Sequence, residues 1–290
     1  MTLESLQPSP PSLTETAARA EQLRALHASG LVLPNAWDAL SARLLQEAGF
    51  SAIGTTSAGV AFALGQPDGQ VLPRADGLQA LARMVAAVQV PVTADLEAGY
   101  GHSPEDVAQT VQAAVELGAA GVNLEDATGE AHAPLYPLAA QVARLTAARE
   151  AADALGVPLY LNARTDTYFT AFGQDPAERL AETIRRGRAY LQAGADSAFV
   201  PGVIDPATVQ ALREGIGGPV AVMLQAGGPG APELLAAGAC RVSVGPGLLL
   251  AALGHLAQLA QTLRTGGTFT PPAALPFAQV QGWFSPAAVS

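Results

Sequence analysis

Cysteine is almost absent from this chain, and its scarcity excludes two kinds of protein. The 290 residues contain one cysteine, Cys240. A single thiol can form neither an internal disulfide framework nor a cysteine-rich metal site. Its surroundings, GACRVSVG, are typical of the start of a buried strand, and free cysteine is among the most buried residue types. We therefore expect Cys240 to be a small core residue.

Basic residues and long apolar runs are also scarce. Lys and Arg number 15 against 25 Asp and Glu, so the formal net charge is −10, and no basic run occurs. This balance argues against nucleic acid or an anionic membrane surface as a partner. No stretch is long and apolar enough to span a bilayer. The acidic, Pro-rich start MTLESLQPSPPSLTE has no signal-peptide core, so the sequence predicts a cytoplasmic protein.

What the chain does have is a regular alternation of two kinds of segment. With 49% hydrophobic and 14% charged residues, it can bury a large core. Short apolar runs predict eight strands, over 30–33, 52–55, 92–95, 121–124, 159–163, 198–200, 220–223 and 241–244. Apolar residues at helical spacing fall between them, over 39–48, 104–117, 139–155, 176–193 and 231–237.

This alternation predicts an α/β fold, a (β/α)8 TIM-type barrel, for which ~250 residues is typical. A doubly wound open sheet is the alternative, but it would need a glycine-rich turn after the first strand, and residues 35–39 (NAWDA) contain no glycine. We assign 1–265 to the barrel with an N-terminal extension, and 266–290 to a C-terminal arm on its own or a neighbouring subunit. The run 247–263 is apolar on more than one helical face, and the arm with Phe269, Phe277, Trp283 and Phe284 is too apolar for a free tail.

Polar side chains gather where the predicted strands end, which in such a barrel is where the active site forms. Acids follow the second to fourth strands, and one arginine follows the fifth. The candidate site residues that follow the strand ends, with the small residues between them, are in chain order Trp37, Asp38, Thr56, Ser57, Ala58, Gly59, Asp68, Asp95, Glu97, Glu125, Asp126, Arg164 and Gln225.

The acids point to a metal ion. In VTADLEAGYGH (92–102), strand alternation would put Asp95 and Glu97 on one face. A carboxylate at the edge of a core is costly unless it is paired, hydrogen-bonded or metal-bound. All-oxygen ligation favours Mg²⁺ or Mn²⁺. Arg164 would supply a planar fork for a substrate carboxylate, and metal and donors together would stabilise an enolate.

Ordinary interpretations exist for the same residues. Asp38 and Asp126 could be turn-formers or helix caps, and Asp68 lies in a Pro-Asp-Gly turn. Arg164 and Asp166 could form a structural ion pair, and His102 could be a solvated loop residue. The gathering of all these groups at one end of one barrel is what favours a functional site.

Four stretches, LPNAWDALSARLLQEAGFSAIGTTSAG, VPVTADLEAGYG, GVNLEDATG and LNARTD, together resemble the isocitrate lyase/phosphoenolpyruvate mutase superfamily. The likeness covers most of residues 28–250. It implies a (β/α)8 barrel, Mg²⁺, and 2-oxo or 2-hydroxy carboxylate substrates that pass through a pyruvate-like enolate. It also implies a homo-tetramer in which the last barrel helix is exchanged between paired subunits. Asp68, Asp95, Glu125 and Arg164 match family positions, whereas Glu97 replaces the usual second Asp of the strand-three motif.

The loop after the fourth strand departs from the family pattern. Isocitrate and methylisocitrate lyases carry Lys-x-Cys-Gly-His there, with the cysteine as acid–base group, whereas this chain reads DATGEAHAPLYP. The mutase and phosphonopyruvate-hydrolase branch carries a Lys that is also missing. The loop resembles branches that act on simpler 2-oxo acids, including decarboxylases.

We therefore predict a Mg²⁺-dependent carbon–carbon lyase or decarboxylase for a small 2-oxo or 2-hydroxy acid. The alternatives are a non-catalytic binder of 2-oxo dicarboxylates and a phosphonopyruvate-type P–C hydrolase. The predicted metal ligands, direct or through water, are Asp68, Asp95, Glu97 and Glu125. The predicted catalytic residues are Arg164, Glu125 and His132, with Glu130 and Tyr136 as further acid–base candidates. The predicted substrate-binding residues are Trp37, Thr56, Ser57, Ala58, Gly59, Asp95, Arg164 and Gln225.

Overall fold

The computed structural model describes residues 10–284 except 174, 204 and 272. The expectations for residues 1–9, 272 and 285–290 lie outside this range. The described residues form two compact units, one that ends at Pro246 and one that begins at Gly247. Each unit is described by itself.

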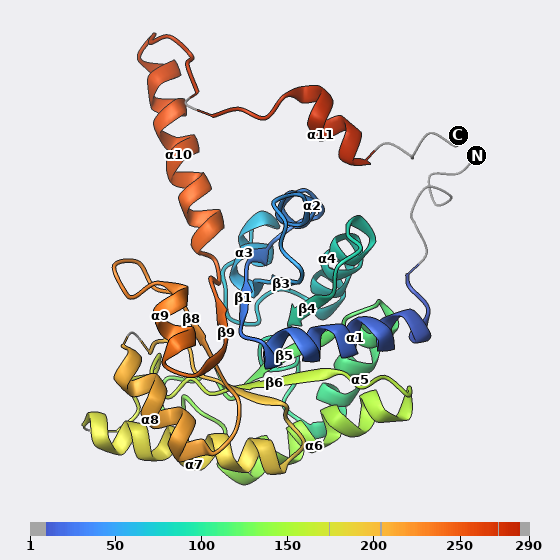
Figure 1. Cartoon of the computed structure of the whole chain (residues 1–290), viewed down its shortest axis with the longest axis vertical. Helices are drawn as coiled ribbons and strands as arrows, with labels where there is room; N and C mark the ends of the chain where they lie inside the picture. The colour runs from blue at the N-terminus through green and yellow to red at the C-terminus, as the bar shows by residue number, and fades with distance from the viewer. Residues whose placement is uncertain (1–9, 174, 204, 272, 285–290) are drawn as a thin grey trace. The chain divides into compact units, whose positions relative to one another are not determined.

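The first unit is built on one parallel sheet of nine strands that forms a nearly closed barrel (Figure 1). The strand order is β1-β9-β8-β7-β6-β5-β4-β3-β2. The strands are β1 (Leu31–Leu33), β2 (Asn35–Ala36), β3 (Ile53–Thr55), β4 (Val92–Asp95), β5 (Gly121–Glu125), β6 (Tyr160–Arg164), β7 (Ser197–Phe199), β8 (Val220–Met223) and β9 (Ala239–Ser243). The predicted TIM-type barrel is confirmed, and each predicted strand lies within two residues of an observed one.

The ninth strand, β2, lies just beyond the first predicted strand (30–33), on the other side of Pro34. Proline has no N–H to donate to a ladder. Before it, β1 pairs with β9, and after it, β2 pairs with β3. The two halves of one chain segment therefore bring the ends of the sheet together.

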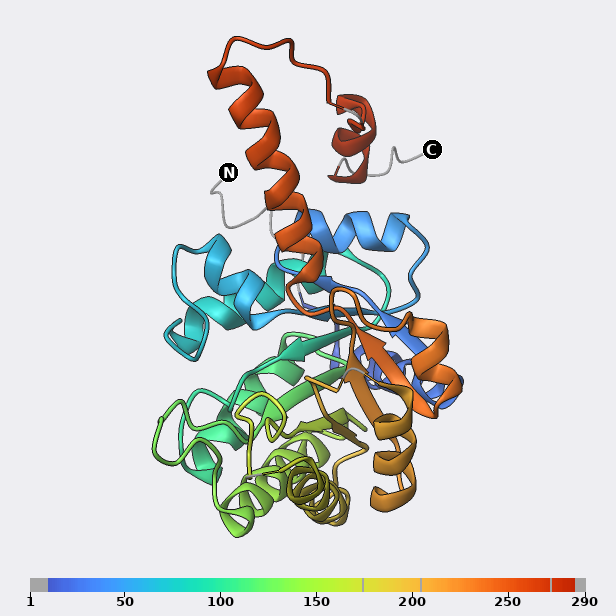
Figure 2. The ribbon, with the colours of Figure 1, turned by 90° about the vertical axis from the view of Figure 1, so that its left-hand side faces the viewer.

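Helices surround this sheet on its outer side (Figure 1; Figure 2). The five predicted helices are confirmed to within one residue at each end. The helices of the first unit are α1 (Leu13–Ala28), α2 (Ala39–Glu47), α3 (Ser57–Ala63), α4 (Arg74–Ala87), α5 (Pro104–Glu116), α6 (Leu138–Ala154), α7 (Pro176–Gln192), α8 (Pro206–Ile216) and α9 (Ala231–Ala236). Asp38 accepts the Ser41 N–H at 2.6 Å, so it is the N-cap of α2.

The interior of the barrel is partly polar. Arg241 on β9 is 1% exposed, and its Nη1 donates to Asn123 Oδ1 on β5 at 3.1 Å. Its guanidinium also lies 4.6 Å from the centre of the Phe199 ring. Helix α1 contacts β1, β6 and β9 beneath this layer. A buried cation therefore lies in the barrel below the strand ends that carry the acids.

The second unit contains α10 (Gly247–Arg264) and α11 (Phe277–Phe284). Several of its apolar side chains are exposed, among them Leu250, Leu253, Leu256 and Leu263 on α10 and Phe277 on α11. Across the described residues, none of the helices is both long enough and apolar enough to cross a membrane.

Candidate active site

Asp95 is the last residue of β4 and is held from two sides. Its Oδ2 accepts the backbone N–H of Ser57 at 3.1 Å and the Ser57 hydroxyl at 2.8 Å. Its Oδ1 lies 3.5 Å from Asn123 Nδ2 on the neighbouring strand. Its own N–H donates to Thr55 Oγ1 at 2.8 Å. Because β3, β4 and β5 are adjacent and parallel, their ends place these groups around one carboxylate.

Glu97 lies beside this site but not by strand alternation, so that part of the prediction is wrong. Strand β4 ends at Asp95, and the backbone of Glu97 is left-handed with φ 52°. Tyr100 (φ 56°) and Gln70 (φ 59°) share this conformation, which costs about 1–3 kcal/mol for a non-glycine residue. Glu97 is 3% exposed, and its Oε2 accepts the backbone N–H of Gln70.

The carboxylates near Asp95 are not neutralised by the protein alone. Burial raises the pKa of Glu97 to about 7, and the Asp95 charge adds to this. Partial burial and then the Asp95 charge raise the pKa of Asp68, although its side chain is exposed. Burial raises the pKa of Glu125 well above its ordinary value, against the lowering effect of Arg164. A cation bound among the acids would offset both the cost of burying these carboxylates and their smaller mutual repulsion.

The donor set fits Mg²⁺ or Mn²⁺ in a restricted way. Within the described residues, no three His, Cys, Asp or Glu side chains form a group that could hold a metal ion by themselves. Mg²⁺ usually keeps several waters and takes one or two carboxylates plus substrate oxygens. Asp95 as a direct ligand, with Asp68 and Glu125 acting through water, is the arrangement that these residues fit.

Arg164 ends β6 and is already paired on one side. Its Nε donates to Asp166 Oδ1 at 2.7 Å and its Nη2 to Asp166 Oδ2 at 3.0 Å, and its Nη1 forms an ion pair with Glu125 Oε2 at 2.8 Å. The predicted structural ion pair is therefore present. A guanidinium has five N–H donors, and Asp166 takes two of them. The remaining N–H groups on Nη1 and Nη2 are suited to a further carboxylate besides Asp166 and Glu125.

Asp126 belongs to a buried network that the sequence did not indicate. It is fully buried and neither caps a helix nor forms a simple turn. Its Oδ1 accepts the Asp166 N–H at 2.9 Å. Its Oδ2 accepts from Arg186 Nη1 at 3.0 Å and from the Tyr190 hydroxyl at 2.6 Å, both on α7. This network fixes the segment that aligns Arg164. The i,i+4 spacing of Arg186 and Tyr190 is the sequence signal that could have indicated it.

The acid–base candidates after β5 are less well placed. His132 and Glu130 are exposed in the loop between β5 and α6. Tyr136 is buried, and its hydroxyl is hydrogen-bonded to His102 Nδ1 at 2.6 Å. His102 is exposed as expected, but it also lines a cavity of about 550 Å³ between the loops, together with Gln70, Arg74, Tyr100, Thr128 and Glu130. No hydrogen bond or ion pair between described residues joins His132 to Asp95 or Arg164.

The remaining substrate-binding candidates follow strand ends, as expected for a barrel. Thr56 is the N-cap of α3, and Ala58 and Gly59 are buried in its first turn. Trp37 after β2 and Gln225 after β8 are half-buried.

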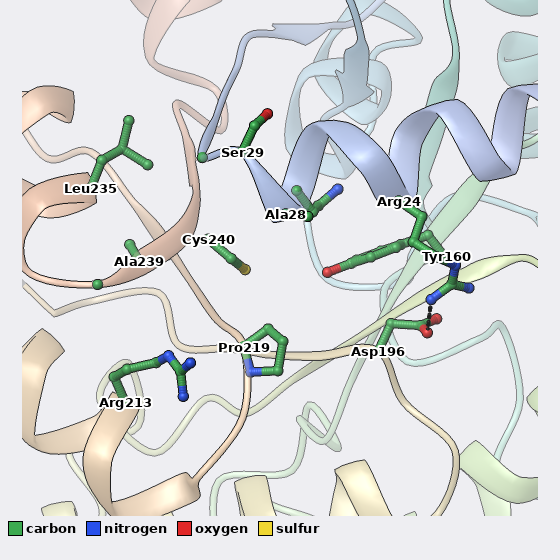
Figure 3. A pocket seen from close by; sticks show the side chains of 13 residues that line it. Arg24, Ala28, Ser29, Tyr160, Asp196, Arg213, Pro219, Leu235, Ala239 and Cys240 are labelled. Carbon is green, nitrogen blue, oxygen red and sulfur yellow. Dashed lines mark hydrogen bonds and ion pairs between the residues drawn. The ribbon is translucent and has the colours of Figure 1, made fainter.

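A second cavity lies at the opposite, N-terminal ends of the strands (Figure 3). It has a volume of about 590 Å³, and its lining includes Arg24, Tyr160, Asp196, Arg213 and Cys240. Cys240 is half-buried there, so its prediction as a core residue is wrong. Arg24 and Asp196 form an ion pair at one side of the cavity. The acids described above are not part of this lining, so we place the chemistry at the C-terminal ends.

Comparisons with known proteins agree with this barrel and its motifs. Residues 23–264 match the family model for phosphoenolpyruvate phosphomutase. The crystal structure of a Burkholderia cenocepacia protein described as a lyase/mutase superposes with a TM-score of 0.87 and has 44% sequence identity. The match covers 94% of this chain and 98% of that one.

Two relatives extend the comparison. An uncharacterized protein of Mycobacterium tuberculosis is 36% identical over 258 residues, which are 88% of this chain and 93% of the relative. Oxaloacetate decarboxylase of Bradyrhizobium diazoefficiens is 30% identical over 274 residues, which are 89% of this chain and 88% of the relative. The predicted enzyme class, carbon–carbon lyase, is thus confirmed at the level of the family. The chain belongs to the phosphoenolpyruvate phosphomutase family, within the superfamily that its strand-end motifs resemble.

Proposed function

We propose that this protein is a Mg²⁺-dependent enzyme that cleaves a carbon–carbon bond in a small 2-oxo or 2-hydroxy carboxylate through an enolate. One observation carries the proposal. Buried carboxylates, whose pKa values are raised by burial first and then in part by the charge of Asp95, lie at the same strand ends as a guanidinium of which Asp166 takes only two N–H donors. The carboxylates would hold a cation, and the Arg164 guanidinium would hold the carboxylate of a substrate.

Each residue then has a stated role. Asp95, fixed by Ser57, would bind the metal, with Asp68 and Glu125 acting through water. The bound metal would polarise the substrate oxygen and stabilise the developing enolate. Arg164 would orient the substrate carboxylate through its remaining Nη1 and Nη2 donors, while Glu125 and Asp166 keep the guanidinium in place.

The test is a panel of 2-oxo and 2-hydroxy acids with Mg²⁺, with coupled detection of pyruvate, glyoxylate and CO₂. We expect turnover of at least one acid, its loss in excess chelator, and its loss in Asp95→Ala. Full activity in excess chelator would contradict the metal assignment. Release of phosphate from phosphonopyruvate would instead support the P–C hydrolase alternative.

A non-catalytic binder of 2-oxo dicarboxylates is the second candidate. It is favoured by the exposure of Glu130 and His132, which leaves the loop after β5 without a proton donor held at Asp95. Both candidates predict ligand binding, so binding alone does not separate them. Binding that requires Mg²⁺ but is followed by no turnover of any acid in the panel would favour the binder.

For assembly we propose a homo-tetramer in which the C-terminal helices pack on a neighbouring subunit. The exposed apolar side chains of α10 and α11 support it, because a helix with leucines on its exposed face needs cover. The division into 1–265 and a 266–290 arm belongs to the same proposal.

A further inference from the structure

Two loops at the strand ends are joined through a single residue, Gln70. Its backbone N–H donates to Glu97 Oε2, and its side-chain Oε1 accepts the Tyr100 N–H at 3.0 Å. The main chain of the Asp68 loop therefore contacts the Glu97 side chain of the loop after β4. The main chain of that second loop, at Tyr100, contacts the Gln70 side chain in return. We call this pair of hydrogen bonds the Gln70 clasp.

The loop that carries Asp68 is almost entirely exposed. Every residue from Phe62 to Val71 is exposed except Gln70, which is half-buried. Leu72 is buried at the end of the loop. Asp68 lies two residues before Gln70, so the clasp fixes the loop close to its carboxylate, which is also hydrogen-bonded to the Gly69 backbone and the Ser57 side chain.

The backbone around the clasp is held in an unusual state. Gln70, Glu97 and Tyr100 all have left-handed φ values, between 52° and 59°, although none is glycine. Such conformations persist only where the surroundings determine them. Because the three residues are also the three members of the clasp, the hydrogen bonds and the backbone conformations support one another.

The length of the Glu97 side chain matters for this contact. One of its carboxylate oxygens already accepts the Gln70 N–H. An aspartate on the same backbone would be roughly 1.5 Å shorter, the length of one carbon–carbon bond, and would not reach. A glutamine would reach and would still present an acceptor oxygen, but it would carry no charge.

We propose that Glu97 is a positioning residue: through the Gln70 clasp it holds the Asp68 loop beside Asp95, and it does not act as a metal ligand. The identity of the metal site rests on the proposed function above. The clasp itself is a property of the metal-free chain, so it can be tested separately.

The test compares four variants of the full-length protein by hydrogen–deuterium exchange of residues 64–73 without metal, and by Mn²⁺ affinity measured with electron paramagnetic resonance. Glu97→Gln retains the clasp. Glu97→Asp keeps the charge but loses the reach. Gln70→Asn tolerates the left-handed backbone but loses the contact to Tyr100. Gln66→Asn, a similar change at an exposed position of the same loop, is the control.

We expect Glu97→Gln and the control to keep wild-type exchange and Mn²⁺ affinity. Glu97→Asp and Gln70→Asn should speed exchange of the loop by about tenfold or more, because opening becomes easier, and should weaken Mn²⁺ binding. Loss of Mn²⁺ binding in Glu97→Gln with normal loop exchange would make Glu97 a ligand and overturn the proposal. Unchanged exchange in both Glu97→Asp and Gln70→Asn would also overturn it. If the wild-type protein binds no Mn²⁺, the proposed metal site is refuted. The exchange rates of residues 64–73 in the variants would still show whether the Gln70 clasp holds the loop.

Discussion

Replacing Arg186 by leucine should destabilise the barrel strongly. The guanidinium donates to Asp126 Oδ2 at 3.0 Å, and its side chain is 5% exposed against 0% for Asp126. Removing one partner of a buried ion pair typically costs about 3–5 kcal/mol, because the other charge stays buried and unpaired. For a domain of this size, each kcal/mol lowers the melting temperature by roughly 2–4 °C. We therefore expect Arg186→Leu to lower it by roughly 10 °C, measured by calorimetry and by urea unfolding.

The neighbouring residue provides a matched control. Arg185 lies on the same helix and pairs with Glu182, but its side chain is 57% exposed. Exposed ion pairs contribute only about 0–1 kcal/mol, so Arg185→Leu should change the melting temperature by a few degrees at most. Equal melting temperatures for the two variants would refute the argument that burial of Asp126 sets the cost.

Three further predictions concern the site and the assembly. Arg164→Lys keeps the charge but loses the planar donors, and losing one charge-assisted hydrogen bond of ~1.5–3 kcal/mol should weaken 2-oxo acid binding about tenfold or more by calorimetric titration; unchanged affinity would move the carboxylate site elsewhere. Burial raises the pKa of Glu97 from 4.5 to about 7, so the folded chain keeps a proton that the unfolded chain loses between these values. Metal-free stability should therefore fall by up to ~3 kcal/mol as pH rises from about 4.5 to about 7 and then level off, and Glu97→Gln should reduce that fall; an equal fall in the variant would assign it to other groups. Light scattering should give a tetramer for the full chain and a smaller species for a chain that ends at Thr265; a truncated tetramer would exclude a role for the arm.

The fold could be predicted because barrel strands and their helices carry local signals. Apolar runs of three to five residues mark the strands, and glycine or capping residues mark the helix ends. Ser103, for example, caps α5 directly before Pro104. The short strand β2 after Pro34 was not predicted, because two residues carry no apolar run of their own and their pairing with β3 depends on the tertiary structure.

The candidate site was predictable to the extent that topology alone brings residues together. Asp95, Glu125 and Arg164 end three consecutive strands of a parallel barrel, so any closed arrangement places them at one rim. Asp126 illustrates what topology leaves out. Its partner Arg186 is 60 residues away, on a helix whose rotation about its own axis decides which arginine faces inward. Helical spacing allows either Arg185 or Arg186, and only packing distinguishes them.

Glu97 illustrates a second reason why sequence reasoning fails. Counting alternate residues from Asp95 assumes that the strand continues, and an extended backbone would indeed put both acids on one face. The chain instead turns at Glu97, whose φ of 52° redirects the side chain. Its carboxylate accepts the backbone N–H of Gln70, a residue 27 positions earlier that belongs to another loop. A residue at the sequence position of a metal ligand, such as Glu97, can therefore form a hydrogen bond to another loop instead. Its role has to be decided from the contact that its side chain makes in the structure.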